Sequence, residues 1–168
     1  MNYIINKRDL ETTINELRKF AYIYMEKYSP SKQQLRIYLF KKFLKKNQKK
    51  TNKKELFNLI DVVISTLIDQ KLLNDEHYSD IKSKAFLRRG YSLNKIRYNL
   101  IAKGIDKKYI KSSISKVEEN ESDPDFFSAI KMCKKRRIGP SREKSNRLLF
   151  YKKDISILAR SGFSYDTS

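Results

Sequence analysis

SLNKIRYNLIAKG, at residues 92–104, repeats the pattern of SKQQLRIYLFKKF at residues 31–43. Each stretch opens on a serine that can cap a helix, with an aliphatic residue four positions on and a leucine eight positions on. Leu39 and Leu100 are 61 residues apart, and Leu158 follows after 58 more. Leu100 and Leu158 each precede a glycine by four residues. The recurrence predicts a helical unit that repeats about every 60 residues.

The rest of the chain is also patterned as short helices. Its four glycines and three prolines fall at the ends of segments whose apolar residues keep a helical spacing. Capping residues stand at four predicted helix starts: Asn74, Ser92, Asp106 and Asp123. The acidic stretch 118–123 is predicted to be a linker. We therefore predict an all-α fold, an elongated tandem array of three three-helix, helix-turn-helix-like modules at residues 12–70, 72–117 and 123–168, the last with a shortened final helix.

Charge is the second strong feature of the sequence. There are 38 lysines and arginines against 19 acids, a net charge of +19. Charge of one sign on this scale attracts a polyanion: nucleic acid, a nucleoprotein filament or an acidic protein groove. The cations are densest in three stretches, residues 41–54, 82–111 and 131–160. The first of these is predicted to be a mobile loop between helices.

Residues that could perform chemistry are sparse. The single cysteine, Cys133, and the single histidine, His77, cannot complete a zinc site. We expect Cys133 to be a buried structural thiol and His77 to lie on the surface. The sequence has no Gly-rich phosphate loop and no nucleophile elbow, so an enzyme is disfavoured. One cysteine and the absence of a long apolar run predict a cytoplasmic protein without a membrane span.

Three segments together carry a family resemblance. They are SPSKQQLRIYLFKK (29–42), LLNDEHYSDIKSKAFLRRGYSLNKIRYNLIAKGIDKKYIKSSI (72–114) and LLFYKKDISILARSGFSYDT (148–167). In order and spacing the chain resembles the RecX family, regulators of the RecA recombinase, over about residues 15–167. It departs from the family pattern in having Asn74-Asp75 where an acidic pair is usual, and in the lysine-rich stretch that ends the first module's second helix.

The resemblance implies a function as well as a fold. It implies a monomer that lies in the groove of a RecA–DNA filament and modulates, most often inhibits, strand exchange, ATP turnover and co-protease action. Such a protein would act in recombination, DNA repair and the SOS response. It would need no cofactor and have no enzymatic activity of its own.

Basic residues beside the predicted helix ends are the candidates for contact with a RecA filament or with DNA. In the middle module they are Arg88, Arg89, Lys95, Arg97 and Lys103, and in the third module Lys134, Lys135, Arg136, Arg137 and Arg142. Such residues suit phosphate contact with counterion release and suit docking on an acidic protein surface. The alternative interpretation is a solvated face in a lysine-rich chain.

A second functional class is a DNA-binding protein that uses its helix-turn-helix-like modules directly. Residues 92–103 carry Asn94, Arg97 and Asn99, which are side chains able to read base edges. The equivalent stretches of the other modules do not repeat this set. Tyr91 and Tyr98 could stack on bases, although core packing is the preferred interpretation of both.

Overall fold

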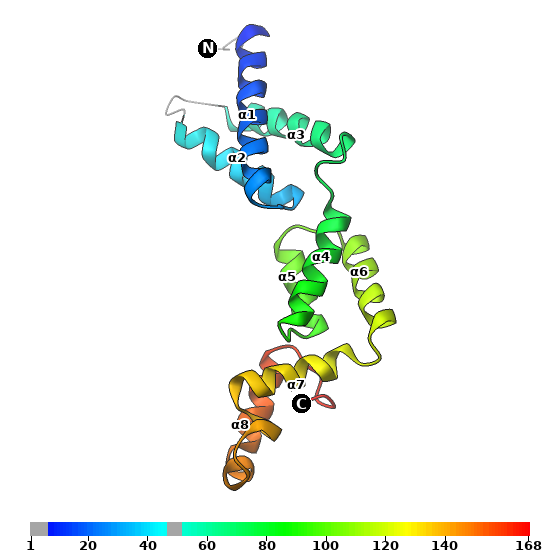
Figure 1. Cartoon of the computed structure of the whole chain (residues 1–168). Coiled ribbons are helices and arrows are strands. Elements are labelled where there is room, and N and C mark those ends of the chain that lie inside the picture. Colours follow the sequence, from blue (N-terminus) through cyan, green and yellow to red (C-terminus); the bar gives the residue numbers. More distant parts are fainter. Residues whose placement is uncertain (1–6, 47–51) are drawn as a thin grey trace. The chain divides into compact units, whose positions relative to one another are not determined.

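The chain folds entirely into helices over the residues that the structure describes. The structure is a computed structural model that describes residues 7–46 and 52–168. These residues form eight α-helices and two short 3-10 helices, with no strand among them (Figure 1). The predicted all-α fold is confirmed. The chain divides into two compact units, one up to Tyr78 and one from Ser79 to Ser168, and helix α4 (Asp75–Arg88) contains the boundary. The three-module division remains a prediction.

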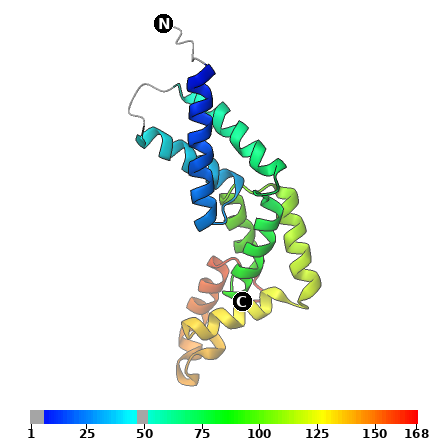
Figure 2. The same cartoon turned by 45° about the horizontal axis from the view of Figure 1, so that its top comes forward.

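The first unit is a group of three helices. They are α1 (Lys7–Lys27), α2 (Lys32–Lys46) and α3 (Lys53–Asp69), each in contact with the other two (Figure 2). Their shared core contains Leu17, Leu35, Leu39, Ile60 and Val63, all fully buried. Burial of one such side chain stabilises the folded state by about 1.5–3 kcal/mol relative to its exposure. The leucines of the 31–43 stretch therefore contribute directly to the core.

The lysine-rich stretch 41–54 is helical at residues 41–46 and 53–54, which corrects the predicted loop at these positions. Residues 41–46 complete α2, and residues 53–54 begin α3; residues 47–51 lie outside the described residues. The Nζ atoms of Lys42 and Lys46 are 5.7 and 5.6 Å from the centre of the Phe20 ring. Apolar Phe43, only 6% exposed, keeps this end of α2 on the core. Because lysine is a good helix former, its charge alone does not end the helix.

The second unit holds the rest of α4 and four more α-helices. They are α5 (Leu93–Ala102), α6 (Lys107–Asn120), α7 (Pro124–Arg136) and α8 (Arg147–Arg160), with 3-10 turns η1 (Gly139–Ser141) and η2 (Lys144–Asn146) between the last two. The predicted caps are confirmed, because Asn74, Ser92, Asp106 and Asp123 each accept a hydrogen bond from a backbone N–H of the following turn. The predicted linker is wrong over residues 118–120, which extend α6 because glutamates favour a helix interior.

Serine pairs hold α4 close to α6. Ser79 and Ser113 share a hydroxyl–hydroxyl hydrogen bond of 2.8 Å, and Ser83 donates to Ser113 at 3.2 Å. All three serines are buried, and each short side chain finds a partner, so the two helices approach without leaving these three hydroxyl groups unpaired. On the rim of this contact Lys116 pairs with Asp80 at 2.7 Å.

The start of α2 is held by two kinds of side chain. Ser31 is fully buried and forms a reciprocal capping box with Gln34, with hydrogen bonds of 3.3 and 3.1 Å. The next backbone amide, Lys32 N–H, donates to Asp75 Oδ1 at 2.8 Å. An aspartate from the first turn of α4 thus satisfies an N–H that the helix itself leaves unpaired.

The start of α5 repeats this arrangement. Ser92 is fully buried and accepts a hydrogen bond from Lys95 N–H at 3.2 Å. Leu93 N–H donates to Asp125 Oδ1 at 2.7 Å, and Asp125 lies in the first turn of α7. The two serines that begin the repeated sequence pattern therefore begin equivalent helices, and each helix start is joined to a later helix by an aspartate.

The chain after α8 also returns to the start of α5. Ser92 Oγ donates to the carbonyl of Ser161 at 2.8 Å, and Asn94 Nδ2 donates to the carbonyl of Gly162 at 3.2 Å. Gly162 has φ +89°, and a Cβ there would lie 2.7 Å from Ser92 Oγ. This approach needs both the left-handed backbone and the missing side chain that glycine provides.

We predict that Gly162→Ala lowers the stability of the protein more than Gly104→Ala does. Both glycines have positive φ, so both substitutions carry the left-handed strain of about 1–2 kcal/mol. Gly104 is exposed, whereas an alanine at Gly162 must also push against Ser92. Thermal denaturation followed by circular dichroism measures the difference, and equal melting temperatures for the two variants would contradict the close approach.

Candidate interaction surface

The end of α4 presents two exposed arginines beside α7. Arg88 ends the helix and Arg89 follows it, and both are exposed. Gly90, with φ +79°, is buried, and a Cβ there would lie 3.1 Å from the carbonyl oxygen of Ser128 and 3.2 Å from Lys131 Cβ. The absence of a side chain at Gly90 lets the α4 end contact the middle of α7. The arginine pair is therefore fixed next to a second cationic helix.

The end of α7 is a run of four exposed cations. Lys134, Lys135 and Arg136 occupy its last turn, and Arg137 follows in the left-handed conformation with φ +54°. Cations are favourable at a helix C-terminus, where the backbone carbonyls concentrate partial negative charge. These four predicted residues share one end of one helix, one turn beyond the point where α4 meets α7.

The predicted contact residues in and after α5 make more contacts within the protein than those at the ends of α4 and α7. Lys95 Nζ lies 4.4 Å from the centre of the Tyr91 ring. Arg97 donates to Asn94 Oδ1 at 3.1 Å and lies 3.7 Å from a carboxylate oxygen of Glu118 on α6. Lys103 follows the last residue of α5, and its backbone N–H caps the helix. All three side chains are half-buried, so they are less available to a partner than the exposed helix-end cations.

Arg142 has a role that the sequence did not reveal. Its Nε and Nη2 atoms donate to the two carboxylate oxygens of Asp154 at 2.9 and 2.7 Å, and its guanidinium lies 4.4 Å from the Phe150 ring centre. Asp154 is 3% exposed and also accepts from Gly139 N–H at 2.8 Å. These donors hold the pKa of the Asp154 carboxyl below its usual value, although burial opposes them. Arg142 thus anchors the loop before α8 to that helix.

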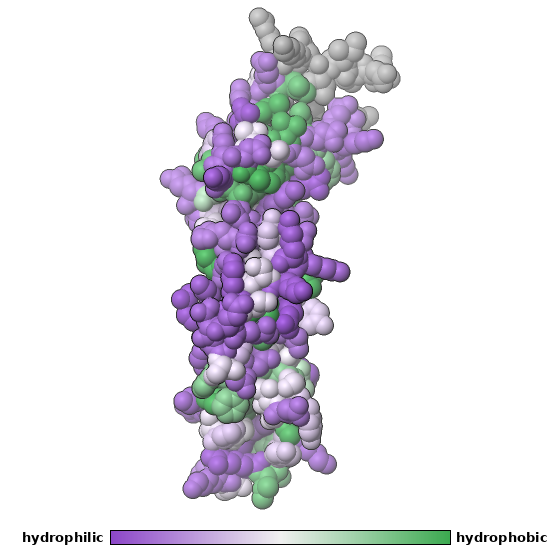
Figure 3. Space-filling view, turned by 90° about the vertical axis from the view of Figure 1, so that its right-hand side faces the viewer, coloured by the Kyte–Doolittle hydropathy of each residue, from purple (hydrophilic) through white to green (hydrophobic). Residues whose placement is uncertain are grey.

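The apolar face of α8 is only partly buried. Leu148 is 92% exposed and Tyr151 is 60% exposed, whereas Leu158 is buried. Leu149 beside them is 76% exposed. The first residue of α8, Arg147, donates hydrogen bonds to the carbonyls of Arg142 and Pro140 in the loop before the helix. In the face that Figure 3 shows, the part formed by α7 and α8 carries more apolar surface than the part formed by α4 to α6.

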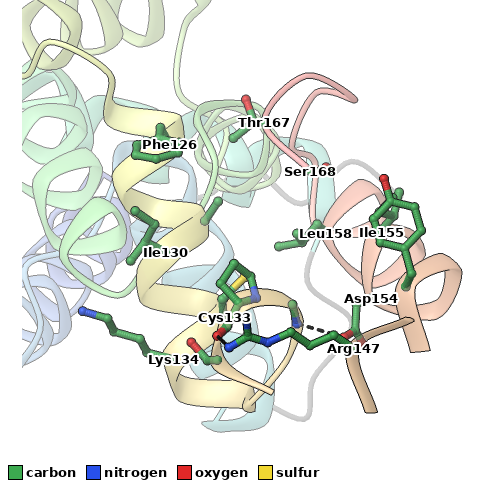
Figure 4. Close-up of a pocket in the computed structure, with 15 residues that line it drawn as sticks. Phe126, Ile130, Cys133, Lys134, Arg147, Asp154, Ile155, Leu158, Thr167 and Ser168 are labelled. Carbon is green, nitrogen blue, oxygen red and sulfur yellow. Dashed lines mark hydrogen bonds between the residues drawn. The ribbon is translucent and has the colours of Figure 1, made fainter. Parts of the chain in front are cut away.

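A pocket of about 650 Å³ lies between α7 and α8. Phe126 and Ile130 extend into it from α7, and Ile155 and Leu158 from α8 (Figure 4). Cys133 also lines it; the thiol is buried as predicted, and burial raises its pKa. Helical spacing identified these apolar residues, but no sequence signal indicated that their shared face stays open.

The candidate base-reading residues have partners within the protein. Asn94 binds the Gly162 carbonyl and Arg97, and Asn99 Nδ2 donates to the Lys95 carbonyl at 2.7 Å. Core packing was wrong for Tyr98, which is 71% exposed. Tyr91 is half-buried and stacks on Phe86 with ring centres 5.3 Å apart. The arrangement of these side chains does not favour direct reading of bases.

The part of the chain that the structure describes holds neither a membrane-spanning helix nor a cluster of metal-binding side chains. None of its helices combines the length and the apolar character that crossing a bilayer requires. Its histidine, cysteine and carboxylate side chains nowhere gather in groups of three that could hold a metal ion. His77 is exposed in the first turn of α4, as expected.

Comparison with known proteins adds an independent observation. The chain is 26% identical to the regulatory protein RecX of Myxococcus xanthus (strain DK1622) over 161 residues, which cover 95% of this chain and 85% of that protein. The chain is thus similar to proteins of the RecX family. Regulatory proteins RecX of Clostridium perfringens strains SM101 / Type A and 13 / Type A are 29% and 31% identical over 61% of the chain. The matched region spans 47% of each of these two proteins.

The RecX match agrees with the resemblance drawn from the sequence motifs. The Myxococcus alignment spans nearly the whole chain and therefore includes both compact units. No family model and no solved structure matches the chain. The family comparison therefore rests on these RecX relatives, which are named as regulatory proteins.

We predict that Arg142→Gln lowers the melting temperature by several degrees, whereas Arg136→Gln leaves it nearly unchanged. Arg142→Gln leaves the buried Asp154 carboxylate without its charged partner, which is costly, while Arg136 is exposed. The pKa of Asp154 is lowered in the folded protein. The ion pair therefore adds its full contribution to the free energy of unfolding above the ordinary carboxyl pKa, and this contribution is lost as the pH falls through the lowered pKa.

The pH dependence of this difference separates the ion pair from a packing effect. The gap in melting temperature between wild type and Arg142→Gln should narrow below about pH 4, because protonation of Asp154 removes the charge that Arg142 compensates. Melting curves between pH 2 and pH 7, at roughly constant ionic strength, measure it. A gap of constant size over that range would contradict the proposed role of Arg142.

Proposed function

We propose that this RecX-family protein regulates a RecA recombinase by binding the RecA–DNA filament, and that binding inhibits strand exchange, ATP turnover and co-protease action. The observation that carries the proposal is the fixed contact of the α4 end with α7. It places the exposed pair Arg88 and Arg89 beside the exposed run 134–137 in one compact unit. A filament of protein and nucleic acid is a polyanion, and a rigid cluster of exposed cations complements it.

The structure refines the set of residues proposed to contact the filament. The six exposed cations, Arg88, Arg89, Lys134, Lys135, Arg136 and Arg137, are the proposed contact residues. Lys95, Arg97 and Lys103 are placed second because they are half-buried. Arg142 is removed from the proposed contact set, since its guanidinium neutralises Asp154.

A protein that acts by binding phosphates and acidic side chains needs no catalytic step and no cofactor, and we propose neither for this chain. We propose that it acts in the cytoplasm, where the recombinase filament forms. A transcription factor that reads a specific DNA site is the less favoured alternative, because Asn94, Arg97 and Asn99 already have intramolecular partners.

We predict that the purified protein suppresses the single-stranded-DNA-dependent ATPase of RecA at sub-stoichiometric amounts. Arg88→Glu combined with Arg89→Glu should raise the concentration for half-inhibition about tenfold, because like charges then face the filament. The control is Lys41→Glu combined with Lys45→Glu, which makes the same charge change at exposed positions of α2. Unchanged ATPase and strand exchange across a full titration would contradict the regulator function.

We also predict weak binding to DNA alone, with little dependence on base sequence. Because such binding depends on counterion release, the affinity for single-stranded DNA should fall with salt by a slope of about −0.7 per phosphate neutralised. Fluorescence anisotropy with two unrelated oligonucleotides at several salt concentrations measures both properties. Nanomolar, site-specific binding at physiological salt would instead support the transcription-factor alternative.

A further inference from the structure

The pocket between α7 and α8 is an apolar face without a helix across it. Phe126 is 47% exposed and Tyr151 is 60% exposed, although both line the pocket together with Ile130 and Ile155 (Figure 4). Thr167 and Ser168, from the turn that follows Phe163, also line the pocket. Large apolar side chains gathered around a concave surface and left in water are typical of a binding site.

Two other helix pairs of the chain show what covers such a face. In the first unit α3 packs across α1 and α2 and buries Leu56, Ile60 and Val63. In the second unit α6 packs on α5, hydrogen-bonds to α4 and buries Ile110, Ile114 and Val117. Each covering helix is amphipathic, with apolar residues spaced three and four apart. Among the described residues no third helix covers α7 and α8 in this way.

The charges around the pocket restrict the kind of helix that fits. Lys134 and Arg147 line the pocket, and Lys131 and Lys152 are exposed on the same two helices. The acid within the pocket, Asp154, is already neutralised by Arg142. An occupant with acidic flanks therefore gains attraction at the rim, whereas a second copy of a chain with a net charge of +19 is repelled.

We propose that the α7–α8 pocket is a docking site for an acidic amphipathic helix of another protein. The apolar face of that helix occupies the position over α7 and α8 that corresponds to α3 over α1 and α2, and its acidic flanks meet Lys134 and Arg147. The proposal does not depend on the recombinase function, since it is argued from apolar surface and local charge alone.

The probe is a fluorescently labelled peptide with the sequence of residues 53–69, which already covers two helices in this chain. An acidic form carries Lys53→Glu and Lys54→Glu. A basic form carries Glu55→Lys, Asp61→Lys and Asp69→Lys. Both forms keep the same apolar face. Anisotropy titration with the full-length chain, without recombinase or DNA, should show the acidic peptide binding at least about tenfold more tightly than the basic one. Equal binding of the two forms, or no binding, would overturn the proposal.

Matched variants of the full-length chain locate the peptide. Ile155→Glu places a charge in the pocket and should weaken binding of the acidic peptide about tenfold or more. Leu149→Glu makes a similar change on α8 outside the pocket and should weaken it far less. Phe126→Ala, which buries no charge, gives a second test if Ile155→Glu lowers the melting temperature. Equal losses for the pocket variants and Leu149→Glu would overturn the proposed location.

A final measurement tests whether a second copy of this chain occupies the pocket instead. Sedimentation equilibrium of the protein alone should show monomers at concentrations where the acidic peptide binds. A dimer that dissociates on Ile155→Glu would assign the pocket to a second copy of the chain and overturn the proposal. These assays contain no RecA, so they test the docking site independently of the proposed function. Failure of the peptide assays would not affect the ATPase prediction, and failure of the ATPase prediction would not affect the peptide assays.

Discussion

Two aspartates fix the starts of two equivalent helices, and the second of them joins α5 to α7, the helix that carries the exposed run 134–137. Asp75 accepts the hydrogen bond of Lys32 N–H, and Asp125 accepts that of Leu93 N–H. Burial raises the pKa of both carboxyls, and the backbone hydrogen bond of each opposes that rise. Asp125 joins α5 to α7, and the close approach at Gly90 holds the end of α4 on α7, so the helices that carry the exposed cations are connected through α7.

The unit formed by residues 79–168 carries two surfaces with different properties. The helix ends carry exposed cations in a fixed arrangement, which suits a broad polyanionic filament surface. The α7–α8 pocket is apolar with a basic rim, which suits a single acidic helix. Arg142 contributes to the second feature only indirectly, since it holds the loop before α8 in place through Asp154. We therefore propose two partners of different shape for this unit, and Lys134 contributes to both proposed surfaces.

Local patterns in the sequence predicted the helices and their caps, because capping depends on residues a few positions apart. Three kinds of feature were missed, all of which depend on contacts between distant residues. The Arg142–Asp154 pair joins two residues whose sequence context suggests no partner, because Arg142 resembles a surface cation and Asp154 resembles an ordinary polar residue of a helix. The exposure of Leu148 and Tyr98 depends on which neighbouring helix is present. The helical form of residues 41–46 depends on the burial of Phe43, which outweighs the repulsion between lysines.

Chemical footprinting on the assembled filament tests the account most directly. Amine acetylation of lysines, read by mass spectrometry with and without RecA–DNA filament, reports which side chains become covered. The account predicts protection of Lys134 and Lys135, with Lys41 and Lys45 of α2 remaining reactive. Protection confined to Lys41 and Lys45, with the α7 lysines unchanged, would contradict the assignment of the filament-binding surface to the α4 and α7 ends.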